Sequence, residues 1–295
     1  MQHTAPVRPH RSVLFMPGAN ARALEKARDL PADGLIFDLE DAVAPDAKVS
    51  ARDAVAAAVG QGGYSKRELV LRVNGLDTKW GGEDLRAAAA MRLDAVLLPK
   101  VESAATVRQA AAILDKADAP PDMAIWCMME TPMGMLHAEE IAASHPRLAG
   151  FVMGTSDLAN DLHARHTRDR LPLLTGLGLC LLAARAYGLV ALDGVYLDLN
   201  DEEGFAHSCR QGVELGFDGK TLIHPKTIAA ANAAFGPSAA EIEQAKRQIA
   251  GFEAAEAQGK GVVLVDGKLV ENLHVANAKR LLALVERIAE LEAGA

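Results

Sequence analysis

The sequence predicts an α/β fold, a (β/α)8 TIM barrel that carries a C-terminal helix–hairpin–helix extension. Two observations lead to this prediction. Eight short apolar runs without polar alternation are spread along the chain, which is typical of parallel strands buried on both faces. Alanine-rich stretches with apolar residues at helical spacing lie between many of them. Eight such strand–helix units in 295 residues favour a closed barrel over a doubly wound open sheet.

The elements of the barrel can be assigned in chain order. The expected strands are Val13–Met16, Leu35–Phe37, Leu69–Val73, Ala95–Leu98, Ala124–Met129, Phe151–Met153, Val195–Leu199 and Phe217–Ile223. Helices are expected at Asn20–Leu30, Ala47–Val59, Glu83–Met91, Ser103–Ala117 and Gly176–Tyr187. No G-x-G-x-x-G sequence follows the first apolar run, so the fingerprint of a dinucleotide-binding fold is missing.

The pattern changes after residue 235. We expect a catalytic barrel domain over residues 1–235 and a lid or oligomerisation extension over residues 236–295. Ser238 and Glu241 have the spacing of a capping box, which predicts the start of a helix. An Asp-Gly pair further on predicts the turn of a hairpin. The expected helix, hairpin and second helix of the extension are Ala239–Gln258, Gly261–Val270 and Val275–Glu292.

The composition excludes several classes of protein. The net charge of −8 is spread along the chain, and aromatic residues make up 4%, which together argue against a nucleic-acid partner. No apolar run approaches the about 20 residues needed to span a membrane, and the N-terminus has no apolar signal-peptide core. The three cysteines are far apart, which argues against a disulfide framework or a thiolate zinc site. We therefore expect a cytoplasmic enzyme without membrane or nucleic-acid partners.

Carboxylates gather where the predicted strands end, which is the active-site face of a barrel. Asp38, Glu40 and Asp41 follow the second strand, and Glu130 and Asp157 follow the fifth and sixth. Because those two strands are consecutive, Glu130 and Asp157 are placed to share Mg²⁺ (or Mn²⁺), which accepts one or two carboxylates and keeps several waters. The alternative is that each acid caps a loop or helix. The cost of an unpaired carboxylate beside a buried strand favours the metal.

Positive charge lies at the same face. Arg72 is near the end of the third strand and needs an anionic partner there. That partner is either the acidic cluster at residues 38–41 or a substrate carboxylate or thioester enolate, and position alone does not decide between them. Lys100 adds a second cation at this rim.

Two segments are candidates for binding anions. Gly154 and Thr155, in the run Gly154-Thr-Ser-Asp157, could present backbone N–H groups to a substrate carboxylate, or could form an ordinary capping turn. Arg22 and Lys26 are one helical turn apart and could meet phosphates, or could lie on a solvated helix face.

Eight motifs follow one another in a recognisable order. They are Arg11-Ser-Val-Leu-Phe-Met-Pro-Gly18, Phe37-Asp-Leu-Glu-Asp-Ala-Val43, Leu71-Arg-Val-Asn74, Leu98-Pro-Lys-Val-Glu102, Glu130-Thr-Pro, Gly154-Thr-Ser-Asp-Leu158, Gly219-Lys-Thr-Leu-Ile-His-Pro225 and Glu271-Asn-Leu-His-Val275. Together they resemble the citrate lyase β-subunit/malyl-CoA lyase family of the HpcH/HpaI aldolase superfamily. Each motif is weak alone, but all of them occur in register over nearly the whole chain.

The resemblance implies a (β/α)8 barrel that assembles as a homotrimer or hexamer and acts on CoA thioesters with Mg²⁺. It implies that Glu130 and Asp157 bind the metal and that Arg72 contacts the reacting substrate. The resemblance also places Phe15, Arg22 and Lys26 at the CoA. Some members have basic residues directly after the Pro-Gly of the first motif, where this chain has Ala-Asn.

The resemblance further implies a catalytic acid from the C-terminal lid of a neighbouring subunit. Many members have Asp at this position, whereas this chain has Glu271, which is longer by one methylene. The expected catalytic residues are therefore Arg72, Glu130 and Glu271.

The expected reaction is reversible cleavage of a 3-hydroxyacyl-CoA such as malyl-, methylmalyl-, citramalyl- or citryl-CoA. The products would be acetyl- or propionyl-CoA and a 2-oxo acid, with Arg72 stabilising the enolate and Glu271 transferring the proton at the thioester α-carbon. Three alternatives stay open: a malyl-CoA thioesterase, a CoA-independent metal-dependent 2-oxo-acid aldolase, and the β-subunit of a larger citrate lyase complex. The sequence does not specify the acyl group or the physiological direction.

Overall fold

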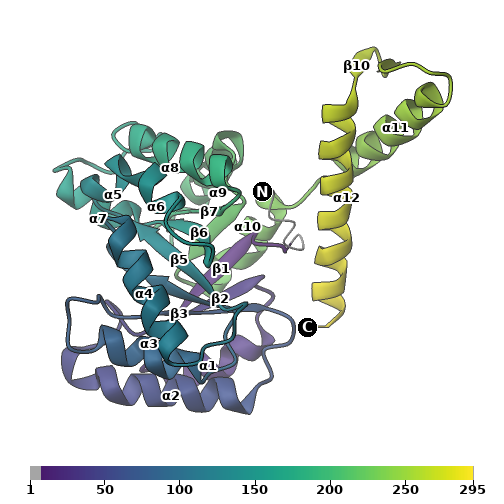
Figure 1. Cartoon of the computed structure of the whole chain (residues 1–295). Helices are drawn as coiled ribbons and strands as arrows, with labels where there is room; N and C mark the ends of the chain where they lie inside the picture. The colour runs from purple at the N-terminus through teal and green to yellow at the C-terminus, as the bar shows by residue number, and fades with distance from the viewer. Residues whose placement is uncertain (1–7, 295) are drawn as a thin grey trace. The chain divides into compact units, whose positions relative to one another are not determined.

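The computed structural model describes residues 8–294. Eight parallel strands pair in chain order, and β8 pairs back with β1 to close a barrel. Helices surround this barrel in Figure 1. The predicted (β/α)8 barrel is confirmed, and no helix among the described residues is both long and apolar enough to cross a membrane.

The strands are short and the helices follow them along the chain. The barrel strands are β1 (Ser12–Pro17), β2 (Gly34–Asp38), β3 (Glu68–Arg72), β4 (Ala95–Leu98), β5 (Ala124–Met129), β6 (Leu148–Met153), β7 (Val190–Asp193) and β8 (Gly219–Leu222). The helices are α1 (Ala21–Lys26), α2 (Lys48–Gln61), α3 (Gly81–Ala89), α4 (Ala104–Lys116), α5 (Pro132–Leu136), α6 (Ala138–Ala142), α7 (Thr155–Asp161), α8 (Leu174–Tyr187), α9 (Glu202–Leu215) and α10 (Ile228–Phe235), with short 3₁₀ turns at Ala27–Asp29, Pro45–Ala47 and Pro225–Thr227.

Alternate side chains of the strands build two separate cores. One face of the strands fills the barrel interior with Val13, Ile36, Val70, Ala95, Leu97, Trp126, Met128, Val152 and Leu192. The other face packs with the surrounding helices into a larger apolar cluster. Both faces are therefore buried, which explains why the strands are apolar throughout rather than alternating.

The predicted position of the seventh strand is wrong. It was expected at Val195–Leu199, but β7 occupies Val190–Asp193 and the expected segment is a loop. Helix α8 ends at Tyr187 and is followed by Gly188 in a left-handed conformation, so the chain turns there and the next apolar residues enter the barrel. Pairing with β8 fixes this register, because Asp193 lies opposite Lys220 and binds its ammonium group.

Residues 236–294 form a second compact unit, described here by itself. It contains α11 (Ala239–Glu256), β9 (Val263–Val265), β10 (Lys268–Val270) and α12 (Asn272–Ala293). The predicted capping box opens α11: the Ser238 hydroxyl accepts the Glu241 N–H, and the Glu241 carboxylate accepts the Ser238 N–H. The helix–hairpin–helix extension is thus confirmed.

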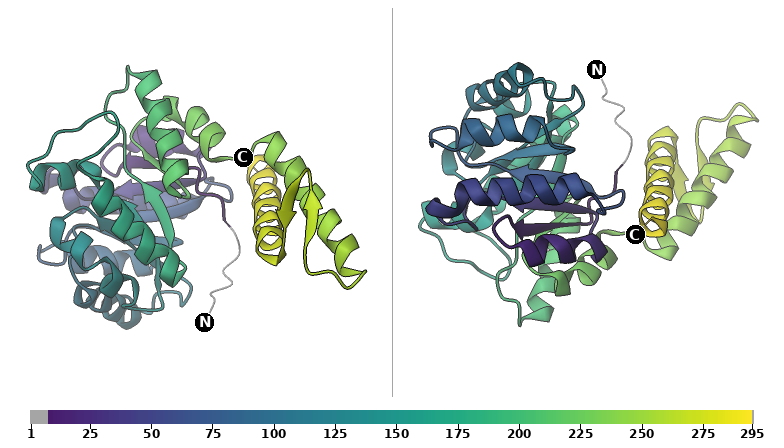
Figure 2. Two further views of the ribbon diagram at one scale, coloured as in Figure 1. Left: turned by 90° about the horizontal axis from the view of Figure 1, so that it is seen from above. Right: turned by 90° about the horizontal axis from the view of Figure 1, so that it is seen from below.

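The hairpin of this unit turns at Asp266 and Gly267. Both residues have positive φ angles, as a two-residue type I′ turn requires. Helices α11 and α12 pack side by side, with the hairpin joining them (Figures 1 and 2). A small core of Phe252, Val270 and Val275 holds the hairpin against the helices.

Candidate active site

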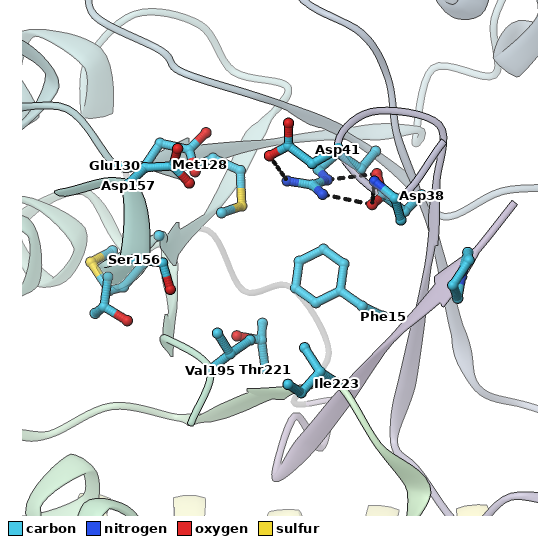
Figure 3. Close-up of a pocket in the computed structure, with 16 residues that line it drawn as sticks. Phe15, Asp38, Asp41, Met128, Glu130, Ser156, Asp157, Val195, Thr221 and Ile223 are labelled. Carbon is cyan, nitrogen blue, oxygen red and sulfur yellow. Dashed lines mark hydrogen bonds and ion pairs between the residues drawn. The ribbon is translucent and has the colours of Figure 1, made fainter. Parts of the chain in front are cut away.

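A cavity of about 400 Å³ lies at the carboxyl ends of the barrel strands (Figure 3). Eight residues singled out from the sequence line it: Phe15, Asp38, Asp41, Arg72, Glu130, Gly154, Thr155 and Asp157. The other lining residues are Pro17, Ala42, Met128, Met153, Ser156, Val195, Thr221 and Ile223. Residues far apart in the chain therefore meet at one place, the part of a barrel where active sites are found.

Arg72 is fixed by the acids that follow β2. Its Nε donates to Oδ1 of Asp38 at 2.7 Å and its Nη2 donates to Oδ2 at 2.6 Å. The two residues thus form a bidentate ion pair. The Nη1 atom is 2.9 Å from Oε2 of Glu40 and 3.7 Å from Oδ2 of Asp41. The structure thus contains the internal ion pair that was one of the two interpretations of Arg72.

This anchoring also leaves Arg72 able to face a ligand. The guanidinium carbon is 5.1 Å from the centre of the Phe15 ring, within range of a cation–π contact. Burial lowers the pKa of Arg72, but the hydrogen bonds and charges of Asp38, Glu40 and Asp41 outweigh burial and raise it. Arg72 is a permanently charged group whose remaining N–H donors are available at the cavity.

Glu130 follows β5 and is 1% exposed. Its Oε1 accepts the backbone N–H of Lys100 at 2.8 Å, whereas its buried Oε2 has no hydrogen-bond partner. Burial raises the pKa of Glu130 to about 7; the charge of Asp157 also raises it, against the Lys100 N–H and the charge of Arg72. A buried carboxylate oxygen without a partner is costly unless a cation or proton compensates it.

Asp157 lies in the first turn of α7, directly after β6, and its side chain is 40% exposed. Figure 3 shows the carboxylates of Asp157 and Glu130 next to each other on one wall of the cavity. The ammonium group of Lys100 is 3.9 Å from Oδ1 of Asp157 and 3.1 Å from Oε1 of Glu40. Lys100 therefore connects the two acidic groups of the rim.

The turn between β6 and α7 allows this close approach. A Cβ atom at Gly154 would overlap the Cβ and Oε2 atoms of Glu130. Thr155 next to it is buried, with 4% exposure. The small residues of this turn thus make room for Glu130, a packing role that the sequence alone did not predict.

The donor set fits a hard divalent cation. Among residues 8–294, no group of three or more His, Cys, Asp or Glu side chains gathers as a metal cage. Two carboxylates, one with an unpartnered buried oxygen, instead suit an ion that keeps several water ligands, as Mg²⁺ does. Glu130 and Asp157 are the residues that could hold it.

Three predicted site residues do not line the cavity. Arg22 and Lys26 are exposed on α1 and are not among the lining residues. Glu271 precedes α12 in the C-terminal unit, where it is exposed and its backbone N–H donates to Nδ1 of His274.

The apolar wall of the cavity was not predicted from the sequence. Met128, Met153, Val195, Thr221 and Ile223 line it beside the acids. Met128 precedes the predicted strand end by one residue, and Thr221 in β8 is two residues before Ile223, which directly follows that strand. Strand alternation could have identified such residues, because side chains at every second position face the same way.

Comparison with known proteins identifies the family. The family model described as HpcH/HpaI aldolase/citrate lyase matches residues 11–225, which contain all eight barrel strands. The chain belongs to the HpcH/HpaI aldolase/citrate lyase family. The resemblance drawn from the eight motifs is therefore confirmed.

Curated relatives within this family match over the full length. A (3S)-malyl-CoA thioesterase of Cereibacter sphaeroides (strain KD131 / KCTC 12085) is 55% identical over 293 residues, covering 99% of this chain and 100% of the relative. The citrate lyase subunit beta of Escherichia coli (strain K12) is 37% identical, covering 95% of this chain and 94% of the relative. The family is thus enzymatic. The two relatives are named for different reactions, one a thioesterase and the other a lyase.

Solved structures of the family contain ligands of the expected kind. The CitE protein of Mycobacterium tuberculosis in complex with magnesium, acetoacetate and coenzyme A has a TM-score of 0.75 at 30% identity, covering 97% of this chain and 100% of that chain. A citrate lyase beta subunit from M. tuberculosis complexed with oxaloacetate and magnesium has a TM-score of 0.67 at 33% identity, covering 78% and 98%.

Proposed function

We propose that this protein is a Mg²⁺-dependent enzyme that hydrolyses the CoA thioester of a short hydroxy dicarboxylic acid of the malyl type. The sequence motifs favour carbon–carbon cleavage, with hydrolysis as an alternative. The 55% identity to a malyl-CoA thioesterase over 99% of the chain now favours hydrolysis. The cavity of about 400 Å³ lies at the low end of the range typical of small-molecule sites.

One observation carries the proposal: Glu130, whose buried Oε2 has no hydrogen-bond partner, lines the cavity beside Asp157. These two carboxylates would hold Mg²⁺, with water and substrate oxygens completing its coordination. When bound, Mg²⁺ supplies Lewis-acid polarisation of substrate oxygens and a template for their orientation. The solved structures of relatives with magnesium and oxo acids support the same ligand class.

The remaining cavity residues bind and orient the acyl group. Arg72, held rigid by Asp38, presents its other N–H donors to a carboxylate or to the thioester oxygen, where negative charge develops as water attacks. Phe15 lies beside the guanidinium and gives the acyl chain an apolar surface. Gly154 donates its backbone N–H to the carbonyl of Met129 at 3.0 Å, so it provides space on this wall rather than a donor for the substrate.

The catalytic role of Glu271 stays a prediction. In this proposal it enters the cavity of a neighbouring subunit in a homotrimer or hexamer and acts there as general acid or base. Mixing Glu271→Gln subunits with Arg72→Ala subunits tests this. Recovery of activity in verified mixed oligomers supports a residue supplied by another subunit, and no recovery contradicts it.

Reversible carbon–carbon cleavage is the second candidate. The citrate lyase relatives and the magnesium–acetoacetate–CoA complex of CitE favour it. In that reaction the β-hydroxyl loses its proton, the bond between the α- and β-carbons breaks, and Arg72 stabilises the resulting acyl-CoA enolate. The enolate is then protonated at its α-carbon to give acetyl-CoA, and the hydroxyl carbon becomes the carbonyl of the oxo acid.

Product analysis distinguishes the two reactions. The purified protein is incubated with Mg²⁺ and (3S)-malyl-CoA in water labelled with ¹⁸O, and the products are followed by mass spectrometry. Hydrolysis gives free CoA and malate with one ¹⁸O in its new carboxylate, whereas carbon–carbon cleavage gives acetyl-CoA and glyoxylate. Acetyl-CoA and glyoxylate as the only products would contradict the proposed hydrolysis, and no consumption of the ester would contradict both reactions. Glu130→Gln serves as the inactive control.

A further inference from the structure

Lys100 touches both acidic groups of the cavity rim. Its backbone N–H donates to Oε1 of Glu130 at 2.8 Å. Its ammonium group is 3.1 Å from Glu40, 3.9 Å from Asp41 and 3.9 Å from Asp157. One residue thus positions a buried carboxylate with its backbone and neutralises other carboxylates with its side chain.

The backbone of Lys100 has an uncommon conformation. Its φ angle is +47°, in the left-handed region of the backbone that residues other than glycine rarely adopt. The residue follows Pro99 at the end of β4, so the strained turn lies at the active-site face of the barrel. Such strain at a functional face is kept only where the surrounding structure holds it.

The rim carries more negative than positive charge. The carboxylates of Asp38, Glu40, Asp41, Glu130 and Asp157 surround it, and the ion pairs found for them within residues 8–294 involve Arg72 and Lys100. Arg72 is bound to Asp38 and Glu40 and cannot shift without breaking that contact. The side chain of Lys100 is 47% exposed, so it is the more mobile of these two cations.

We propose that Lys100 is a built-in counter-ion of the metal site, whose ammonium group neutralises the rim carboxylates when no metal is bound and thereby lowers the affinity for divalent cations. The inference rests on the proposed function, because it takes Glu130 and Asp157 as the ligands of Mg²⁺. A divalent ion at these acids repels the ammonium group 3.9 Å from Asp157. The repulsion is relieved when the exposed ammonium group moves away from Asp157 and keeps its hydrogen bond to Glu40, whose other oxygen binds Arg72.

The charge of the Lys100 ammonium group is close enough to Asp157 to change the binding constant of a metal ion measurably. A unit charge within several ångströms of a divalent ion near a protein surface changes its binding constant by at least about tenfold. The effect decreases with ionic strength, because salt screens charges that solvent can reach. A residue with a purely structural role would instead weaken metal binding when replaced, with little dependence on salt.

Calorimetric titration with MgCl₂ tests the inference. The full-length protein is compared with Lys100→Met, which removes the charge, and with Lys100→Arg, which keeps it. Lys116→Met is the matched control, because Lys116 is exposed at the end of α4, which precedes β5 and so lies at the opposite end of the barrel. Lys100→Gln repeats the charge removal in case the Met variant does not fold.

We expect Lys100→Met and Lys100→Gln to bind Mg²⁺ at least about tenfold more tightly than the wild type at low salt, and by a smaller factor at 0.5 M KCl. Lys100→Arg and Lys116→Met should bind like the wild type. Unchanged or weaker binding by both charge-removing variants overturns the inference while leaving the metal site in place. No binding of Mg²⁺ by the wild type contradicts the proposed function itself, and the inference falls with it.

Discussion

Gly154 packs against Glu130 so closely that a single methyl group at position 154 would occupy the space of the Glu130 carboxylate. The backbone of Gly154 has a negative φ angle of −94°, so the glycine is needed for space and not for its backbone conformation. The turn after β6 and the acid after β5 therefore depend on each other.

Gly154→Ala tests this dependence. The new methyl group would displace the Glu130 side chain and the first turn of α7, so we expect Mg²⁺ to bind at least about tenfold more weakly and the turnover rate to fall about 100-fold. Gly178→Ala is the control, because no atom lies within 4 Å of its added Cβ on α8. Calorimetry and steady-state kinetics measure both variants. Wild-type values in Gly154→Ala would show that Glu130 does not need this space.

Asp38→Asn tests whether the ion pair positions Arg72. Both carboxylate oxygens of Asp38 accept N–H groups of Arg72, and an amide NH₂ in place of one oxygen would face a donor. We expect kcat/KM to fall by about 100-fold through misplacement of the guanidinium. Asp41→Asn is the matched control, since its carboxylate is 58% exposed and 3.7 Å from Arg72, and it should lose less than about tenfold. Equal effects of the two substitutions would contradict the assigned role.

The charges between β7, β8 and the loop before α8 are expected to stabilise the barrel. Lys220 and Asp193 are both 0% exposed and 2.8 Å apart, and Arg170 donates to Asp193 at 2.6 Å. Asp193→Ala leaves a buried ammonium group uncompensated, so we expect the free energy of unfolding to fall by about 3–5 kcal/mol. Asp169→Ala, which removes a carboxylate that is 64% exposed, should cost at most about 1 kcal/mol.

Urea denaturation measures both substitutions. Replacing Asp193 and Lys220 together by Leu and Met should cost less than Asp193→Ala alone, because the fully buried ammonium group is removed with its partner and only Arg170, with a side chain that is 11% exposed, loses Asp193. A double variant less stable than the single variant would argue that the pair contributes more than mutual compensation.

The free energy of unfolding is expected to depend on pH through the protonation of His10. Its Nε2 is 2.6 Å from Oε2 of Glu68. Burial lowers the pKa of His10, but the charge and hydrogen bond of Glu68, with Asp218 and Asp33, raise it above 6.5 overall. The protonated imidazole is thus favoured in the folded protein. Its contribution to stability is complete below pH 6.5 and is lost as the pH rises through the raised pKa of the folded protein.

The comparison with His10→Gln measures this contribution. The difference in the free energy of unfolding between the wild type and the variant should be larger at pH 6 than at pH 9, in parallel urea titrations. A difference that stays constant or grows with pH would contradict a raised pKa of His10.

Much of the fold could be predicted because it depends on local patterns. Apolar runs buried on both faces located seven strands, and the capping box and Asp-Gly turn located the extension. The predicted position of the seventh strand was wrong because Val195–Leu199 is as apolar as Val190–Asp193. The choice between them depends on Asp193 meeting Lys220, a contact between strands that a local pattern does not show.

The candidate site was predictable to the extent that strand ends converge in a barrel. This rule brought Arg72, Glu130 and Asp157 to one cavity. It did not show that Arg72 is bound to Asp38, because both interpretations of the arginine required an acid or anion nearby. It also could not show the strained conformation of Lys100, since no glycine marks that turn.

The claim that Glu130 and Asp157 hold a divalent cation is tested most directly by titrating Mg²⁺ into the wild type, Glu130→Gln and Asp157→Asn and comparing the binding isotherms. We predict one site per chain in the wild type and no saturable binding in either variant, with folding of each variant verified by circular dichroism. Wild-type affinity and stoichiometry in both folded variants would contradict the claim.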